Sequence, residues 1–187
     1  MGLLDTLLGR SKPVQPDLDQ LFALPSAAVT LQAALGFSAT GVGSVCFKPA
    51  EGVAFAGLEE QVAQLLALDG GKYERSVDSY GFDWLVRRVA PTELDSLVTD
   101  LHAANSGLAE AGFGPALLCT VVAFSDGTRS IGLVYLYKRG SWYPFAQAGE
   151  NRRDNALELQ LQAALGDDLH LEKDLARWFP VYGAPGL

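Results

Sequence analysis

The stretch ALLCTVVAFSDGTRSIGLVYLY, residues 116–137, contains two apolar runs separated by the turn residues Ser125–Thr128. An Asp-Gly pair between two apolar runs is the strongest short-range signal of a β-hairpin. The runs Ala116–Phe124 and Ile131–Tyr137 are therefore predicted to be its two strands. Neither run alternates with polar residues, so we expect both faces of these strands to be covered and the strands to be central in a sheet.

Further strand signals lie on both sides of this hairpin. A third strand, Trp142–Phe145, follows the turn at Arg139–Gly140. Tyr73–Asp78 and Phe82–Val89 are predicted to form a second hairpin. Phe37–Phe47 has the composition of a strand, and the glycines within it indicate a turn or a bulge.

The clearest helix follows Pro91–Thr92 and ends at Gly112. Its apolar residues recur at helical spacing and form one stripe: Leu94, Leu97, Val98, Leu101 and Leu108. Asn105 lies within this stripe, so it is expected to be a buried polar group with a partner. Shorter helices are predicted at 18–24 after an N-cap at Asp17, at 25–35 before Gly36, at 58–68, at 156–165 after an N-cap at Asn151, and at 174–178.

These elements predict an α+β fold, an antiparallel sheet of hairpin-connected strands packed with helices. The length of 187 residues fits one ordinary domain, which we place at 17–187. Residues 1–16 are predicted to be a short N-terminal amphipathic arm and linker. The arm carries Leu3, Leu4, Leu7 and Leu8 on one side, and Pro13 and Pro16 interrupt any helix after it.

The composition excludes several classes of function. With a formal net charge of −8, the chain is expected to be repelled by nucleic acid and by anionic lipid unless it carries a local basic patch. Its two cysteines, Cys46 and Cys119, lie in apolar stretches and are expected to be buried free thiols in a reducing compartment. No apolar run approaches the length of a membrane span and the start does not resemble a signal peptide, so a cytoplasmic location is expected.

No pattern in the sequence indicates catalysis, a metal site or a cofactor. Asp167, Asp168, His170 and Glu172 lie close together but have the character of a solvated loop. The remaining enzyme alternative pairs Cys119 as a nucleophile with His102 as its base. We therefore expect a binding protein rather than an enzyme.

One candidate ligand site combines aromatic and cationic residues around the third strand. Its members are Tyr135, Lys138, Arg139, Trp142, Tyr143, Arg152, Arg153 and Asp154. Arginines near a helix start are suited to binding an anion. The alternative is an aromatic core beneath a hairpin, with Arg–Asp pairs on its rim.

Two apolar segments are candidate partner-binding surfaces. The leucine arm spans about 12 Å as a helix, too short to hold a membrane alone but long enough to dock in a groove. The alternative is that the arm packs back on its own domain. The second segment is the apolar C-terminal tail, including Trp178 and Phe179. The apolar composition also leaves a homo-oligomer open.

A family resemblance extends over the whole chain. It is carried by MGLLD at 1–5 with LGR at 8–10, LFALPSAAVTLQ at 21–32, DSYGFDWLV at 78–86, LVTDLHAAN at 97–105, LVYLYKRGSWYPFA at 133–146, RRDNALELQ at 152–160 and RWFPVYGAPGL at 177–187. In these stretches the chain resembles the actinobacterial PspA-associated family PspAB, an accessory of the phage-shock response to membrane stress.

The resemblance implies a non-enzymatic adaptor or regulator of a PspA-type protein. It brings no established catalytic residues. PspA-type proteins are long helical hairpins that coat stressed membranes and offer apolar grooves, which gives the leucine arm a use. The resemblance thus implies that the chain engages the membrane only indirectly, through this partner. From the residues alone, the alternative remains a domain that senses a small anion.

Overall fold

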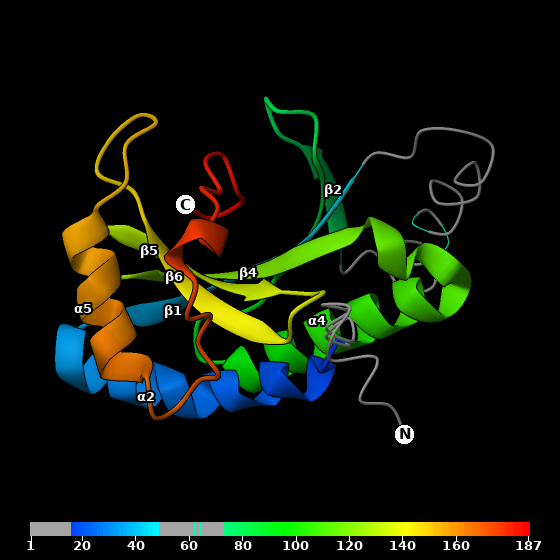
Figure 1. The fold of residues 1–187 in the computed structure, drawn as a ribbon. Helices are drawn as coiled ribbons and strands as arrows, with labels where there is room; N and C mark the ends of the chain where they lie inside the picture. The colour runs from blue at the N-terminus through cyan, green and yellow to red at the C-terminus, as the bar shows by residue number, and fades with distance from the viewer. Residues whose placement is uncertain (1–15, 49–61, 63, 65–72) are drawn as a thin grey trace, which may run out of the picture.

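The computed structural model describes residues 16–48, 62, 64 and 73–187. The described fold is built on a six-stranded antiparallel sheet in the order β2-β3-β1-β4-β5-β6. The strands are β1 Ser38–Phe47, β2 Tyr73–Val77, β3 Asp83–Arg88, β4 Leu117–Ser125, β5 Ser130–Leu136 and β6 Ser141–Ala146. With its helices, this sheet confirms the α+β prediction (Figure 1). The leucine arm lies outside the described residues.

The β4–β5 hairpin forms where the Asp-Gly signal predicted it. Phe124 pairs with Ile131, and Ser125 pairs with Ser130. In the turn, the Asp126 carboxylate accepts hydrogen bonds from the amides of Arg129 and Thr128, which hold the pKa of Asp126 well below its usual value. Gly127 supplies the positive φ of 91° that the turn requires.

Helices cover one face of the sheet. Figure 1 shows α2 (Leu24–Leu35) and α4 (Leu94–Leu108) beneath the strands, with α5 (Asn155–Leu165) at one end. The apolar stripe of α4 is buried except for Leu94. Leucines of α2 and α5 are buried in the same core. Asn105 is buried as predicted, and its Nδ2 donates to Thr120 Oγ1 at 2.9 Å and to the Leu101 carbonyl at 2.8 Å.

The C-terminal segment, residues 170–187, covers the opposite face. It includes the short 3-10 helix η5 (Leu175–Arg177) and is drawn in red above the sheet in Figure 1. A second core forms beneath it, from Trp178 and Ala184 and from sheet residues including Trp84 and Tyr143. The central strands are thus covered on both faces, as their unbroken apolar runs predicted.

The β6 edge of the sheet is also covered by this segment. The Trp142 amide donates to the His170 carbonyl at 2.8 Å, and the Glu172 amide donates to the Trp142 carbonyl at 2.7 Å. This gives β6 a short parallel neighbour, the bridge from Trp142 to Leu171. Capping an edge in this way removes a template for pairing with other chains.

Some local predictions are wrong in detail. Residues 18–23 form the 3-10 helix η1 (Leu18–Ala23), which continues directly into α2, and the Asp17 side chain does not cap it. The N-cap of α5 is Asp154 rather than Asn151, because Asp154 Oδ1 accepts from the Leu157 amide at 3.0 Å. Asn151 lies in the preceding turn with a positive φ of 52°.

The other predicted strands agree with the structure. The strand at 37–47 is continuous with a bulge between Ala39 and Gly43, and the hairpin of β2 and β3 turns at 78–82. The helix predicted at 58–68 lies outside the described residues, apart from Val62 and Gln64. In the described part of the chain, no helix has the length and apolar run that a membrane span needs.

Candidate partner-binding cleft

An apolar cleft of about 470 Å³ opens between the C-terminal segment and the turn that joins β2 to β3. Three parts of the chain line it. The turn contributes Asp78, Tyr80 and Phe82, the sheet contributes Cys46, Trp84, Leu118, Cys119, Leu136 and Tyr143, and the C-terminal segment contributes Phe179, Pro180, Val181 and Tyr182. This volume is within the range of pockets that bind ligands or inserted side chains.

Asp78 fixes the wall made by the turn. Its Oδ1 accepts from the amides of Tyr80 and Phe82 at 2.9 and 3.0 Å. Its Oδ2 accepts from the indole Nε1 of Trp84 at 2.9 Å. A short acidic side chain that bonds the backbone two to four residues ahead stabilises a tight turn. Asp78 therefore holds the turn against the floor of the cleft.

Aromatic contacts hold the opposite wall. Tyr143 donates its hydroxyl to the Phe179 carbonyl at 2.8 Å, and its ring stacks on Trp178 with centroids 5.9 Å apart. The Phe145 and Tyr182 rings meet edge to face at 5.3 Å. Both sheet residues lie on β6, so one strand anchors two points of the C-terminal segment.

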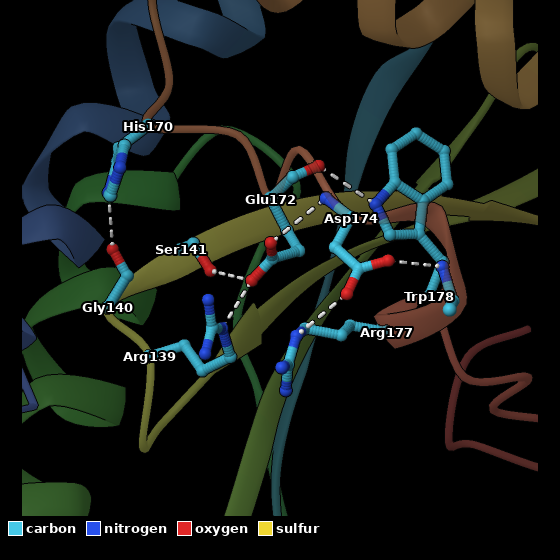
Figure 2. Close-up of polar contacts among 9 residues, drawn as sticks. Arg139, Gly140, Ser141, His170, Glu172, Asp174, Arg177 and Trp178 are labelled. Carbon is cyan, nitrogen blue, oxygen red and sulfur yellow. Dashed lines mark hydrogen bonds and ion pairs between the residues drawn. The ribbon is translucent and has the colours of Figure 1, made fainter. Parts of the chain in front are cut away.

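Two buried carboxylates anchor the same segment from its flanks. Glu158 of α5 accepts from Arg153 Nε at 2.9 Å, and Arg153 also donates to the Trp178 carbonyl. Figure 2 shows Glu172, which accepts from Arg139 Nε at 2.5 Å, Ser141 Oγ at 3.1 Å and the Asp174 amide at 3.1 Å. The Glu172 carbonyl accepts from the Trp178 indole at 3.0 Å. Trp178 is therefore held at both its backbone and its ring.

The pKa of Glu172 reflects these bonds. Burial alone would raise it, because a charged carboxylate loses its hydration. Hydrogen bonds from the Asp174 amide, Arg139 and Ser141 favour the ionised form and outweigh burial, so the pKa is lowered from 4.5. Glu172 is thus an ionised structural anchor.

Two aromatic side chains on the rim of the cleft face solvent. Phe179 is 60% exposed and Tyr80 is 58% exposed. The Tyr80 hydroxyl contacts Asn151 Oδ1 at 3.1 Å. Of the two residues predicted for partner binding in the C-terminal segment, the structure therefore leaves Phe179 accessible and buries Trp178.

The aromatic residues of the predicted anion site are divided between the two cores. Tyr135 and Trp142 pack edge to face, with ring centroids 5.4 Å apart, in the core between the sheet and the helices. The Tyr135 hydroxyl donates to the Asp17 carbonyl and the Trp142 indole donates to the Gln20 carbonyl. Tyr143 lies on the other face, beneath the C-terminal segment.

The four cations of that predicted site contact four different partners. Arg139 pairs with Glu172 and Arg153 pairs with Glu158. Lys138 Nζ donates to the Pro115 carbonyl at 2.8 Å, and Arg152 donates to the Ala148 carbonyl at 3.0 Å. Asp154 is occupied as the cap of α5. Binding of an anion at these residues stays a prediction.

The structure does not bring the proposed nucleophile pair together. Cys119 faces the C-terminal segment. His102 belongs to α4 on the opposite side of the sheet, where its Nε2 lies 3.6 Å from Asp19 Oδ1 and its ring 4.8 Å from Phe22. A base on the other face of a sheet cannot reach the thiol.

Sequence reasoning did not identify the cleft. Its walls come from the 78–82 turn and residues 179–182, about a hundred positions apart along the chain. The one local signal was Asp78-Ser-Tyr-Gly81, a turn sequence with an aromatic residue at its tip. No pattern in the sequence indicated that the C-terminal segment returns to this turn.

No curated protein and no solved structure matches the chain. The model of a protein family does match, over residues 1–186. The chain therefore belongs to the family described as PspAB, PspA associated protein B.

Proposed function

We propose that this chain is a non-enzymatic adaptor that associates with a PspA-type protein and receives it in the apolar cleft. The family description names an association with PspA. The observation that carries the proposal is the pair of solvent-facing aromatic rings, Phe179 and Tyr80, on the rim of a cleft with an apolar lining. Aromatic residues around a pocket are typical anchors of protein interfaces.

The chemistry of the cleft suits a helical partner. An amphipathic helix binds a groove by inserting apolar side chains spaced three or four residues apart. Leu118, Leu136 and Val181 line the cleft and would contact such side chains. Phe179 and Tyr80 would pack against them at the rim. Asp78 and Arg153 hold the two walls in place, which reduces the ordering that binding would otherwise require.

The charge of the chain supports contact with a protein rather than with lipid. A net charge of −8 is unfavourable at an anionic membrane surface. In this proposal the partner provides the membrane contact. The leucines of the arm, Leu3, Leu4, Leu7 and Leu8, are a second surface that the partner could engage.

Co-elution in size-exclusion chromatography tests the proposal and separates the two surfaces. The purified chain is mixed with a PspA-type protein at tens of micromolar, alongside a truncated chain that lacks residues 1–12. Co-elution of both forms supports the cleft. Loss of co-elution on truncation assigns the contact to the arm and contradicts the cleft. The absence of co-elution for either form contradicts the adaptor function.

A further inference from the structure

The chain contains two cysteines, and the fold places them side by side. Cys46 on β1 is the register partner of Cys119 on the antiparallel strand β4. Paired residues of an antiparallel ladder point to the same face, and both belong to the core beneath the C-terminal segment. They are separated by more than seventy positions in sequence, so tertiary structure alone makes them neighbours.

The separation of paired strands fits a covalent link. Directly opposite residues in an antiparallel pair have Cα atoms about 4.5–5.5 Å apart. A disulfide spans Cα separations of about 4.4–6.8 Å. The neighbouring Cys119 thiol and burial raise the pKa of Cys46. The register thus places the two cysteines within the Cα range that a disulfide spans.

The cleft gives a small reagent access to these sulfurs. Cys46 and Cys119 are only 4% and 7% exposed, but both line the cleft floor. A hydroperoxide is small relative to a volume of about 470 Å³.

We propose that Cys46 and Cys119 are a site of reversible oxidation, at which a hydroperoxide converts the two thiols to one intramolecular disulfide between β1 and β4. One sulfur attacks a peroxide oxygen, the O–O bond breaks, and a sulfenic acid forms with release of water or an alcohol. The second sulfur then attacks the sulfenic sulfur, the S–S bond forms, and water leaves. The two thiols lose two electrons and two protons, and the peroxide is reduced.

The disulfide restricts the relative movement of the two strands at the floor of the cleft. It ties together two central strands and closes the whole chain segment between them into a loop, which restricts the unfolded state. The midpoint of thermal unfolding therefore rises on oxidation and returns on reduction. This chemistry concerns the isolated chain and does not depend on binding of a PspA-type protein.

Mass spectrometry of the full-length native chain tests the proposal. After treatment with hydrogen peroxide, we expect a monomer that has lost two hydrogens and that shows no free thiol when denatured. Dithiothreitol is expected to restore both thiols. The variants Cys46→Ala and Cys119→Ala each retain one thiol and are expected to show no such loss of hydrogens.

Two results overturn the proposal. One is a native chain that keeps both thiols under peroxide treatment that oxidises the urea-unfolded chain. The other is oxidation that only adds oxygen to single cysteines or only links separate molecules. The mass and free-thiol measurement on the natural chain decides the proposal by itself. A variant that fails to fold therefore does not affect the conclusion.

Discussion

Arg153 donates to the carboxylate of Glu158 at 2.9 Å and, with a second nitrogen, to the carbonyl of Trp178. Glu158 is buried and also accepts from the Ala146 amide at 3.0 Å. One guanidinium therefore connects α5, the end of β6 and the C-terminal segment. This connection holds one wall of the cleft against the sheet.

Removing this guanidinium should cost more than removing an exposed one. Arg153→Met leaves the buried charge of Glu158 without its ion-pair partner, and such a change destabilises by about 3–5 kcal/mol. Arg177→Met, in an exposed pair with Asp174, should cost about 1 kcal/mol or less. Urea unfolding of both variants measures the difference. Equal losses of stability would contradict the anchoring role of Arg153.

The stability should decline in acid partly through Glu172. Its pKa in the folded chain is lowered from 4.5, so its contribution is complete above the unfolded value and is lost as the pH falls through the folded value. Glu172→Gln cannot ionise and should show a smaller loss of unfolding free energy between neutral pH and about pH 3. Urea titrations of both proteins across this range provide the test. Parallel pH profiles would show that Glu172 has the same pKa in both states.

Removing the buried hydroxyl of Ser44 and that of Thr120 should have different effects on the free energy of unfolding. Ser44 Oγ has no hydrogen-bond partner among the described residues, whereas Thr120 Oγ1 accepts from Asn105. Removing the Ser44 hydroxyl in Ser44→Ala should leave stability unchanged or raise it by up to about 1 kcal/mol. Thr120→Val takes an acceptor from a buried amide and should cost about 1–3 kcal/mol. Chemical denaturation that finds the reverse order would contradict these assignments.

Gly186 should tolerate a side chain less well than Gly183. Both have positive φ, at 93° and 78°. A Cβ on Gly186 would lie 2.9 Å from Ala123 Cβ and 3.0 Å from Val42 Cγ1, whereas one on Gly183 would meet nothing closer than 3.9 Å. Gly186→Ala should therefore lower the thermal midpoint more than Gly183→Ala. Equal midpoints would mean that the chain end does not pack on β1 and β4 as described.

The local features of the fold were predictable from the sequence. The Asp-Gly turn between β4 and β5, the stripe of α4 and the burial of Asn105 follow from patterns within a few residues of one another. The cap of α5 was assigned incorrectly because Asn151 and Asp154 are both good caps, and only the position of the Leu157 amide distinguishes them.

The cleft and the ion pairs could not be predicted in this way. Arg139 finds its carboxylate at Glu172, far along the chain, and the route of the C-terminal segment decides that pairing. The same route brings Phe179 and Tyr80 to one cleft, whose lining also includes Cys46 and Cys119. Apolar residues in a tail indicate that it packs somewhere, but the packing site depends on the shape of the completed sheet.

Titration calorimetry with a purified PspA-type protein tests the binding surface most directly. Phe179→Asp places a charge on the rim of the cleft, while Val29→Asp makes the same change at an exposed position of α2 on the other face of the sheet. We predict that Phe179→Asp weakens binding at least about tenfold, or by 1.4 kcal/mol, and that Val29→Asp matches the natural chain. Equal affinities for the natural chain and Phe179→Asp would contradict the cleft as the proposed binding site for a PspA-type protein.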